Sequence, residues 1–89
     1  MSTILDAELA DCVRNNAVTE LHIVQQQNKK FIVEVLLTWK DGPTTLITQR
    51  KEIREWASVD RLIAHIQENY GVIPLITVVP FVPPLLFQN

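Results

Sequence analysis

The chain has 89 residues, of which 47% are hydrophobic and 20% are charged, and its formal net charge is −2 at pH 7. These values are ordinary for a globular protein, and the length leaves room for one domain rather than two. A slightly acidic chain has no general attraction to nucleic acid or to anionic membranes. Composition therefore excludes a polybasic binder and a multidomain protein, and it names no partner.

The cysteine count and the first residues bear on the compartment. Cys12 is the single cysteine, so the chain cannot form an internal disulfide. The opening stretch, MSTILDAELADC, has neither the basic start nor the long apolar run of a secretory signal peptide. We expect a cytoplasmic protein.

The first third of the chain predicts a short helix followed by a strand. The helix is capped by Ser2 or Asp6 and ends at Asn15 and Asn16, and its apolar face is formed by Leu5, Leu9, Cys12 and Val13. Alternating residues around Leu21 and Ile23 then predict a strand of about seven residues. The polar residues 26–30 predict a hairpin turn after it.

The middle of the chain predicts two further strands. Phe31 to Trp39 alternates over its whole length, with Phe31, Val33, Val35, Leu37 and Trp39 on one face, and we expect this strand to be central. The turn residues 40–43 precede a third strand from Thr44 to Gln49. Strands joined by such short loops are antiparallel. The charged residues 50–55 then cross to a helix, and we expect Trp56 to pack under this crossing.

The strongest single pattern is a helix from Val59 to Tyr70. Ser58 can cap its first turn, and Asp60 complements the positive end of the helix dipole. Gly71 can adopt the left-handed conformation that closes a helix, and Pro74 prevents continuation. One apolar stripe is formed by Val59, Leu62, Ile63, Ile66 and Tyr70.

Leu75 to Val79 predicts a fourth strand, and the whole pattern predicts an α+β fold of order αβββαβ. We expect two layers, with an antiparallel sheet of about four strands and both helices on one face. The other face, which carries Ile32, Leu36 and Ile47, is only partly polar. Residues 1–80 form the domain, and residues 81–89 form an extended apolar tail.

The carboxy-terminal stretch has no charged side chain after Glu68. Its prolines, including Pro80 and Pro83, exclude a membrane-spanning helix, so we expect no membrane partner. The tail carries more large apolar side chains than a protein leaves in water, namely Phe81, Val82, Leu85, Leu86 and Phe87. The tail therefore folds back over the sheet, covers a second copy of the protein, or docks on something else.

No pattern in the sequence predicts catalysis. The two glycines, Gly42 and Gly71, do not make a phosphate-binding loop. His22 and His65 do not have the spacing of a zinc site with Cys12, and we interpret both as surface residues. Cys12 lies on an apolar stripe, where a thiol packs as a small hydrophobe. We expect no enzyme, no cofactor and no metal.

Basic residues suggest a second kind of surface. Phosphate contacts are made by side chains of this type, and Trp56 could offer a stacking face. Glu52 and Glu55 are interleaved with the run, which favours a solvated connection instead. Nucleic-acid binding is therefore kept as the alternative, and its candidate residues are Lys29, Arg50, Lys51 and Arg54.

Residues 31–79 resemble a group of short bacterial proteins of plasmids and other mobile elements, the ParC-like, partition-associated proteins. The resemblance rests on the long apolar strand, on a second strand containing Thr45, Leu46 and Thr48, on the basic stretch that ends at Arg54 and Trp56, and on the helix opening with residues 58–62. It implies a role accessory to plasmid maintenance and no reaction. The tail from Tyr70 is not part of the resemblance.

These patterns favour a small non-enzymatic interaction protein of a mobile element. Its partner, which the sequence does not identify, would dock on the apolar tail or on the open sheet face, and self-association is one form this could take. DNA binding ranks second, and an enzyme whose pocket the sequence does not show ranks third.

Overall fold

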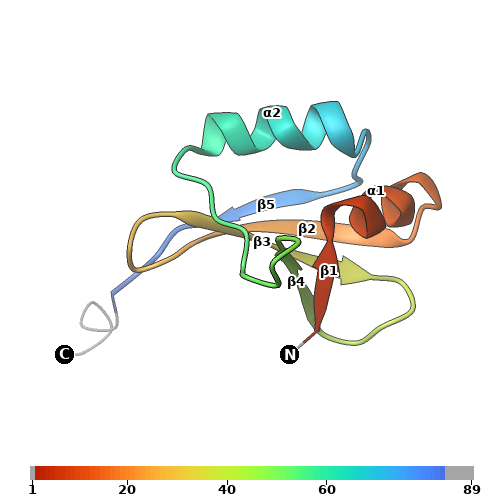
Figure 1. Cartoon of the computed structure of the whole chain (residues 1–89), viewed down its shortest axis with the longest axis horizontal. Helices are drawn as coiled ribbons and strands as arrows, with labels where there is room; N and C mark the ends of the chain where they lie inside the picture. Colours follow the sequence, from red (N-terminus) through yellow and green to blue (C-terminus); the bar gives the residue numbers. More distant parts are fainter. Residues whose placement is uncertain (1, 84–89) are drawn as a thin grey trace.

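Two helices cover one face of a five-stranded mixed sheet in the computed structural model of the chain (Figure 1). The structure describes residues 2–83. The elements are β1 (Thr3–Leu5), α1 (Asp6–Arg14), β2 (Val18–Gln25), β3 (Phe31–Leu37), β4 (Pro43–Ile47), α2 (Val59–Asn69) and β5 (Ile76–Val79). The α+β class and the two helices of the predicted pattern are confirmed.

The strand order across the sheet is β1-β4-β3-β2-β5, so β3 is central as predicted. β3 is antiparallel to both of its neighbours, while β1 is parallel to β4 and β5 is parallel to β2. The prediction of about four antiparallel strands was wrong in two respects. β1 has three residues, too few for a pattern, and β5 returns through the α2 crossover, which allows parallel pairing.

The α2 helix begins and ends where the sequence indicates. Ser58 is its N-cap, and the Ser58 hydroxyl accepts a hydrogen bond from the Arg61 N–H. Tyr70 is the C-cap, and Gly71 follows with a φ of 84°, the left-handed conformation that glycine adopts without strain. The predicted apolar stripe faces the sheet, with Leu62, Ile66 and Tyr70 buried.

The α1 helix has a different cap from the one predicted. Leu5, rather than Ser2 or Asp6, is the N-cap, because β1 runs directly into the helix. The Leu5 N–H donates to the Glu8 carboxylate at 3.0 Å, which satisfies a backbone donor of the first turn. Ser2 instead accepts a backbone hydrogen bond from Thr45 N–H beside β4.

One hydrophobic core lies between the helices and the sheet. Leu9 and Val13 from α1 meet the α2 stripe above the inward-facing residues of the strands, among them Leu21, Ile23, Val33, Val35 and Leu46. These buried side chains are worth about 1.5–3 kcal/mol each before chain entropy is subtracted. The core therefore fixes the helix layer on one side of the sheet.

Trp39 was predicted to extend the inward face of the central strand, and this was wrong. β3 ends at Leu37, and a turn closed by the Lys40 N–H on the Leu37 carbonyl carries Trp39 out to solvent, where it is 66% exposed. Trp56 was expected under the 50–55 crossing and does pack against the core, though it is only partly buried. The Trp56 backbone pairs with Phe31 at the start of β3.

Candidate functional site

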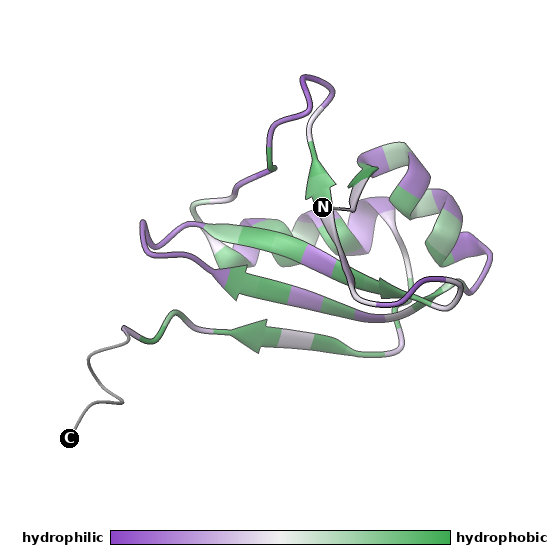
Figure 2. Ribbon diagram, turned by 90° about the horizontal axis from the view of Figure 1, so that it is seen from below, coloured by the Kyte–Doolittle hydropathy of each residue, from purple (hydrophilic) through white to green (hydrophobic). Residues whose placement is uncertain are grey.

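The outer edge of β5 is the most apolar exposed region of the described chain. Nine large hydrophobic residues of the described chain are exposed. All of them except Trp39 and Ile53 lie between residues 72 and 82. Figure 2 shows β5 at the margin of the sheet, apolar along its length apart from a pale band. The exposed members of this segment are Val72, Leu75, Ile76, Val78, Val79, Phe81 and Val82.

The backbone of β5 has one satisfied edge and one open edge. The Leu21 N–H donates to the Leu75 carbonyl at 2.9 Å, and Leu21 is in register with Ile76. In a parallel ladder the residues that bond the neighbour alternate along the strand, so Thr77 and Val79 face β2. The N–H and C=O groups of Ile76 and Val78 therefore point away from the sheet. Within residues 2–83, no other strand pairs with that edge.

An open strand edge of this kind is a template for pairing with another strand. Native proteins commonly protect such edges with charges, prolines, a bulge, a covering segment or a very short strand. β5 has no charged residue, and after Glu68 the sequence contains none. Prolines 74 and 80 bound the strand and limit the open edge to a short window.

The predicted tail residues divide into two groups. Phe81 and Val82 are 38% and 42% exposed, and the Phe81 N–H donates to the Gln25 side chain at 3.2 Å, beside the end of β2. These two residues continue the apolar surface of β5. Leu85, Leu86 and Phe87 lie outside the described residues.

A shallow hollow lies near the other end of β5. It is lined by Val72 and Pro74 from the segment between α2 and β5, and by Val13, Asn16 and Val18 from the end of α1 and the start of β2. Val72 is 89% exposed, the largest exposure among the large apolar residues. The hollow therefore extends the apolar edge toward α1.

The open face of the sheet is a poorer docking surface than predicted. Ile32 is buried, and Leu36 and Ile47 are only partly exposed. Polar groups occupy the same face near the β5 side, where Glu20 lies 2.9 Å from the His22 ring and accepts a hydrogen bond from Thr77. The His22 hydrogen bond contributes most to holding the pKa of Glu20 below its usual value. Among residues 2–83, the apolar edge is more exposed than this face.

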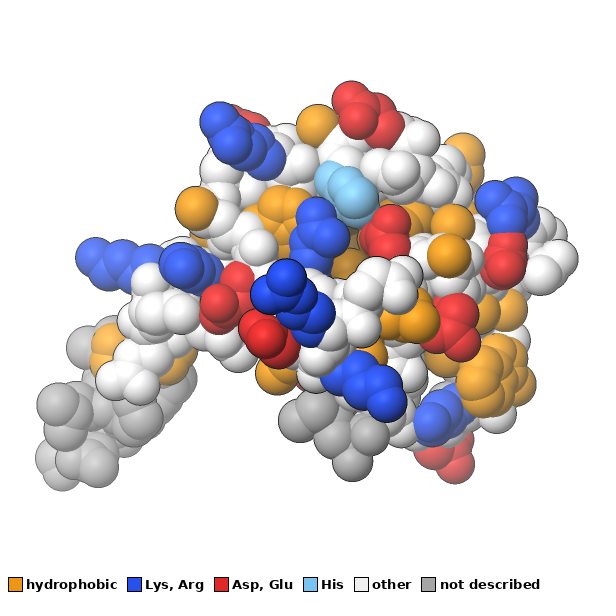
Figure 3. All heavy atoms as spheres, viewed as in Figure 1, with side chains coloured by type: hydrophobic (Ala, Val, Ile, Leu, Met, Phe, Trp, Pro, Cys, Tyr) orange, Lys and Arg blue, Asp and Glu red, His pale blue; other side chains and the backbone are white. Residues whose placement is uncertain are grey.

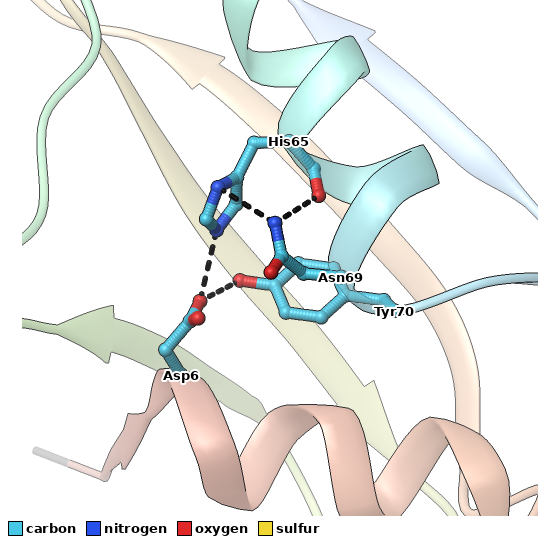
Figure 4. A network of polar contacts seen from close by, with 4 residues as sticks. All are labelled: Asp6, His65, Asn69 and Tyr70. Carbon is cyan, nitrogen blue, oxygen red and sulfur yellow. Dashed lines mark hydrogen bonds and ion pairs between the residues drawn. The ribbon is translucent and has the colours of Figure 1, made fainter.

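A polar cluster between the two helices was missed by the sequence analysis. Asp6, at the start of α1, accepts hydrogen bonds from the Tyr70 hydroxyl and, at 3.0 Å, from His65 Nε2 (Figure 4). Asn69 donates to His65 Nδ1 at 3.1 Å. His65 was interpreted as a plain surface residue. The contact could not be predicted, because Asp6 and His65 are 59 positions apart in a sequence without a long-range signal.

The electrostatics of this cluster follow from its hydrogen bonds. Burial opposes ionisation of the Asp6 carboxyl, but the hydrogen bonds from Tyr70 and His65 outweigh it and hold the pKa of Asp6 below its usual value. Burial, followed by the hydrogen bond to Asp6, raises the pKa of the Tyr70 phenol well above its usual range. At neutral pH the cluster therefore holds a charged carboxylate and a neutral phenol.

The cluster is better described as a structural link than as a catalytic site. Both ring nitrogens of His65 are engaged, and the pattern fits the neutral tautomer with hydrogen on Nε2. The described residues contain no group of three or more His, Cys, Asp or Glu side chains placed to hold a metal ion. Cys12 packs against the core and takes no part in the cluster.

The basic residues of the alternative hypothesis come from separate segments and have acidic side chains among them. The Arg54 guanidinium lies 4.8 Å from the centre of the Trp56 ring, which in turn lies 5.5 Å from the His65 ring. Lys29 lies in the β2–β3 turn, and Arg50 and Lys51 lie in the turn after β4. Figure 3 shows basic and acidic side chains interspersed on this side of the molecule.

Comparison with known proteins gives no relative for this chain. No family model matches, and neither a curated protein nor a solved structure is significantly similar to it. Within residues 2–83, no helix combines the length and the apolar character needed to cross a bilayer.

Proposed function

We propose that this chain is a small non-enzymatic interaction protein that binds its partner through the open edge of β5 and the apolar residues beside it. The observation that carries the proposal is the coincidence of two features on one strand. The outward N–H and C=O groups of Ile76 and Val78 offer backbone hydrogen bonds, and most of the exposed large apolar side chains of the described chain lie along the same segment. Strand addition uses both features, since the backbone supplies affinity and the side chains supply specificity.

The size of the apolar segment also supports this role. Apolar surface removed from water contributes about 25 cal/mol per Å², and covering several such side chains therefore offsets part of the cost of ordering a partner strand. The neighbouring polar residues are already paired within the chain, as Thr77 is with Glu20. A partner strand would therefore meet an apolar edge without a charged side chain of its own, beside a Glu20 carboxylate that is already hydrogen-bonded within the chain.

The biological setting is a separate part of the proposal. The resemblance of residues 31–79 to ParC-like, partition-associated proteins supports a role accessory to the maintenance of a bacterial plasmid or mobile element. A cytoplasmic location is consistent with that setting. Both parts rest on the sequence pattern, and neither is needed for the proposed mode of binding.

Site-specific photo-crosslinking in the native host tests the mode of binding. A photoreactive phenylalanine analogue at position 79 lies on the proposed edge, and the same analogue at position 39 replaces Trp39, an exposed aromatic residue far from it in the sequence. We expect a covalent protein adduct from position 79 and none from position 39. Val78→Pro in the position 79 variant removes an outward N–H and should abolish the adduct.

Two results would contradict the proposal. One is the absence of any adduct at position 79, and the other is an adduct that survives Val78→Pro unchanged. Mass spectrometry of the adduct then identifies the partner, which separates a second copy of this chain from a different protein.

A further inference from the structure

We infer that the occupant of the β5 edge is the β5 edge of a second copy, paired antiparallel about a two-fold axis that passes through Thr77. The inference rests on the proposed function and adds the identity and register of the partner. It depends on the direction of the backbone groups, on the positions of two prolines and on the distribution of exposed apolar residues.

The backbone selects the register. Ile76 and Val78 carry the outward-facing N–H and C=O groups, as the alternation from the Leu21–Leu75 hydrogen bond requires. In an antiparallel pair, residues that exchange both backbone hydrogen bonds lie directly opposite one another. With the axis through Thr77, Ile76 lies opposite Val78 of the partner subunit, and Val78 lies opposite Ile76 of the partner subunit. Every outward group of both residues then finds a partner.

The prolines exclude the neighbouring registers. With the axis through Thr77, Pro74 lies opposite Pro80 of the partner subunit. Each proline, which has no N–H to donate, is therefore opposite another proline, and the pairing ends at the same place on both sides of the axis. A shift of the axis to Val78 would place Ile76 opposite Pro80, and a shift to Ile76 would place Val78 opposite Pro74. Either shift leaves an outward carbonyl without a donor. The central register alone uses the whole window between the prolines.

The exposed apolar side chains match across the same axis. Opposite residues of an antiparallel pair project from the same face of the sheet. Ile76 therefore packs beside Val78 of the partner subunit, and Leu75 beside Val79. The four exposed apolar residues from Leu75 to Val79 are thus covered by one another.

Charge does not oppose this arrangement along the strand. β5 itself carries no charged side chain. The Glu20 carboxylate, which each copy brings close to the axis through its hydrogen bond from Thr77, lies 2.9 Å from the His22 ring of the same copy. A two-fold interface requires a self-complementary patch, and an uncharged edge with a symmetric apolar pattern satisfies that requirement. The sheet then continues from one copy into the other, with the helices of both copies on the same side.

Disulfide trapping tests the register directly. In a Cys12→Ala background, Thr77→Cys places a thiol on the two-fold axis, at a non-hydrogen-bonded pair whose Cα atoms are about 4.5 Å apart, within the range that a disulfide spans. Val79→Cys is the matched control on the same strand and face. Its own copy lies four residues along the partner strand, roughly 13 Å away at 3.3 Å per residue. We expect a covalent dimer from Thr77→Cys under mild oxidation and a monomer from Val79→Cys.

Sedimentation of the unmodified full-length chain is the second readout. We expect a monomer–dimer equilibrium, and we expect Val78→Pro to weaken it by at least about tenfold, because it removes one N–H···O bond from each side of the axis. The Val78 N–H bonds nothing within the chain's own ladder, so the folded monomer should persist. Trp39→Ser, which removes an exposed aromatic outside the edge, should leave the equilibrium unchanged.

Three outcomes would overturn the inference. These are a strict monomer at the highest soluble concentration, a dimer that Val78→Pro does not weaken, and equal disulfide formation at positions 77 and 79. In each case the crosslinking experiment at position 79 still decides the proposed function. An adduct with a different protein would uphold strand addition and reject the second copy.

Discussion

Replacing Tyr70 by Phe tests whether the polar cluster links the two helices. Tyr70 is buried, and its hydroxyl donates to the Asp6 carboxylate. A hydrogen bond to a charged group contributes about 1.5–3 kcal/mol when it is shielded from water. The Asp6 side chain is 40% exposed, so water can replace part of the lost interaction, and we expect a loss of about 1–2 kcal/mol in the free energy of unfolding.

Urea unfolding at pH 7, followed by circular dichroism, measures this loss, and Asp6→Asn completes a double-mutant cycle. The pKa of Asp6 is held below its usual value in the folded chain. Its stabilising effect is therefore present above the unfolded value of 3.8 and is lost as pH falls through the lower folded value. The cost of Tyr70→Phe should shrink accordingly in acid.

Two results would refute this reasoning. A loss below about 0.3 kcal/mol at pH 7 would mean that the hydrogen bond contributes nothing beyond the solvation it replaces. An equal loss in the wild-type and Asp6→Asn backgrounds would mean that Tyr70 acts through packing alone.

Two further predictions concern the stability of the folded chain. Trp56→Ala should cost about 2–4 kcal/mol in urea unfolding, since Trp56 is partly buried against the core, while Trp39→Ala should change stability by less than about 0.5 kcal/mol; similar values for the two would contradict their different placement. The raised pKa of Tyr70 predicts that stability is complete below the phenol's usual value of 10.0 and falls as pH rises above it; a Tyr70→Phe variant should lose less stability over that range, as alkaline unfolding curves will show.

The parts of the fold with local signals could be predicted from the sequence. The α2 helix has a cap at Ser58, an apolar stripe and a closing glycine at Gly71, and each of these acts within one or two turns. The central strand was likewise predicted from alternation. The strand ended earlier than predicted because Trp39, an apolar residue in the correct phase, lies in a turn that backbone hydrogen bonds close. Alternation cannot distinguish the last strand residue from the first turn residue.

The parts that failed depend on contacts between distant residues. β1 is defined only by its pairing with β4, and the parallel pairing of β5 with β2 depends on the path of the chain through α2. The Asp6–His65 contact joins the start of α1 to the middle of α2. The apolar excess at the carboxy end was visible in the sequence, but the sequence did not show that Ile76 and Val78 present an open backbone edge.

Amide hydrogen exchange along β5 is the most direct test of the central claim. In the dilute monomer, the account predicts protection of the Thr77 N–H, which faces β2, and rapid exchange of the Ile76 and Val78 N–H groups, which face outward. When the chain associates through this edge, Ile76 and Val78 should become protected while Thr77 changes little. Protection of Ile76 and Val78 in the monomer, or continued rapid exchange of both in the associated state, would contradict the account.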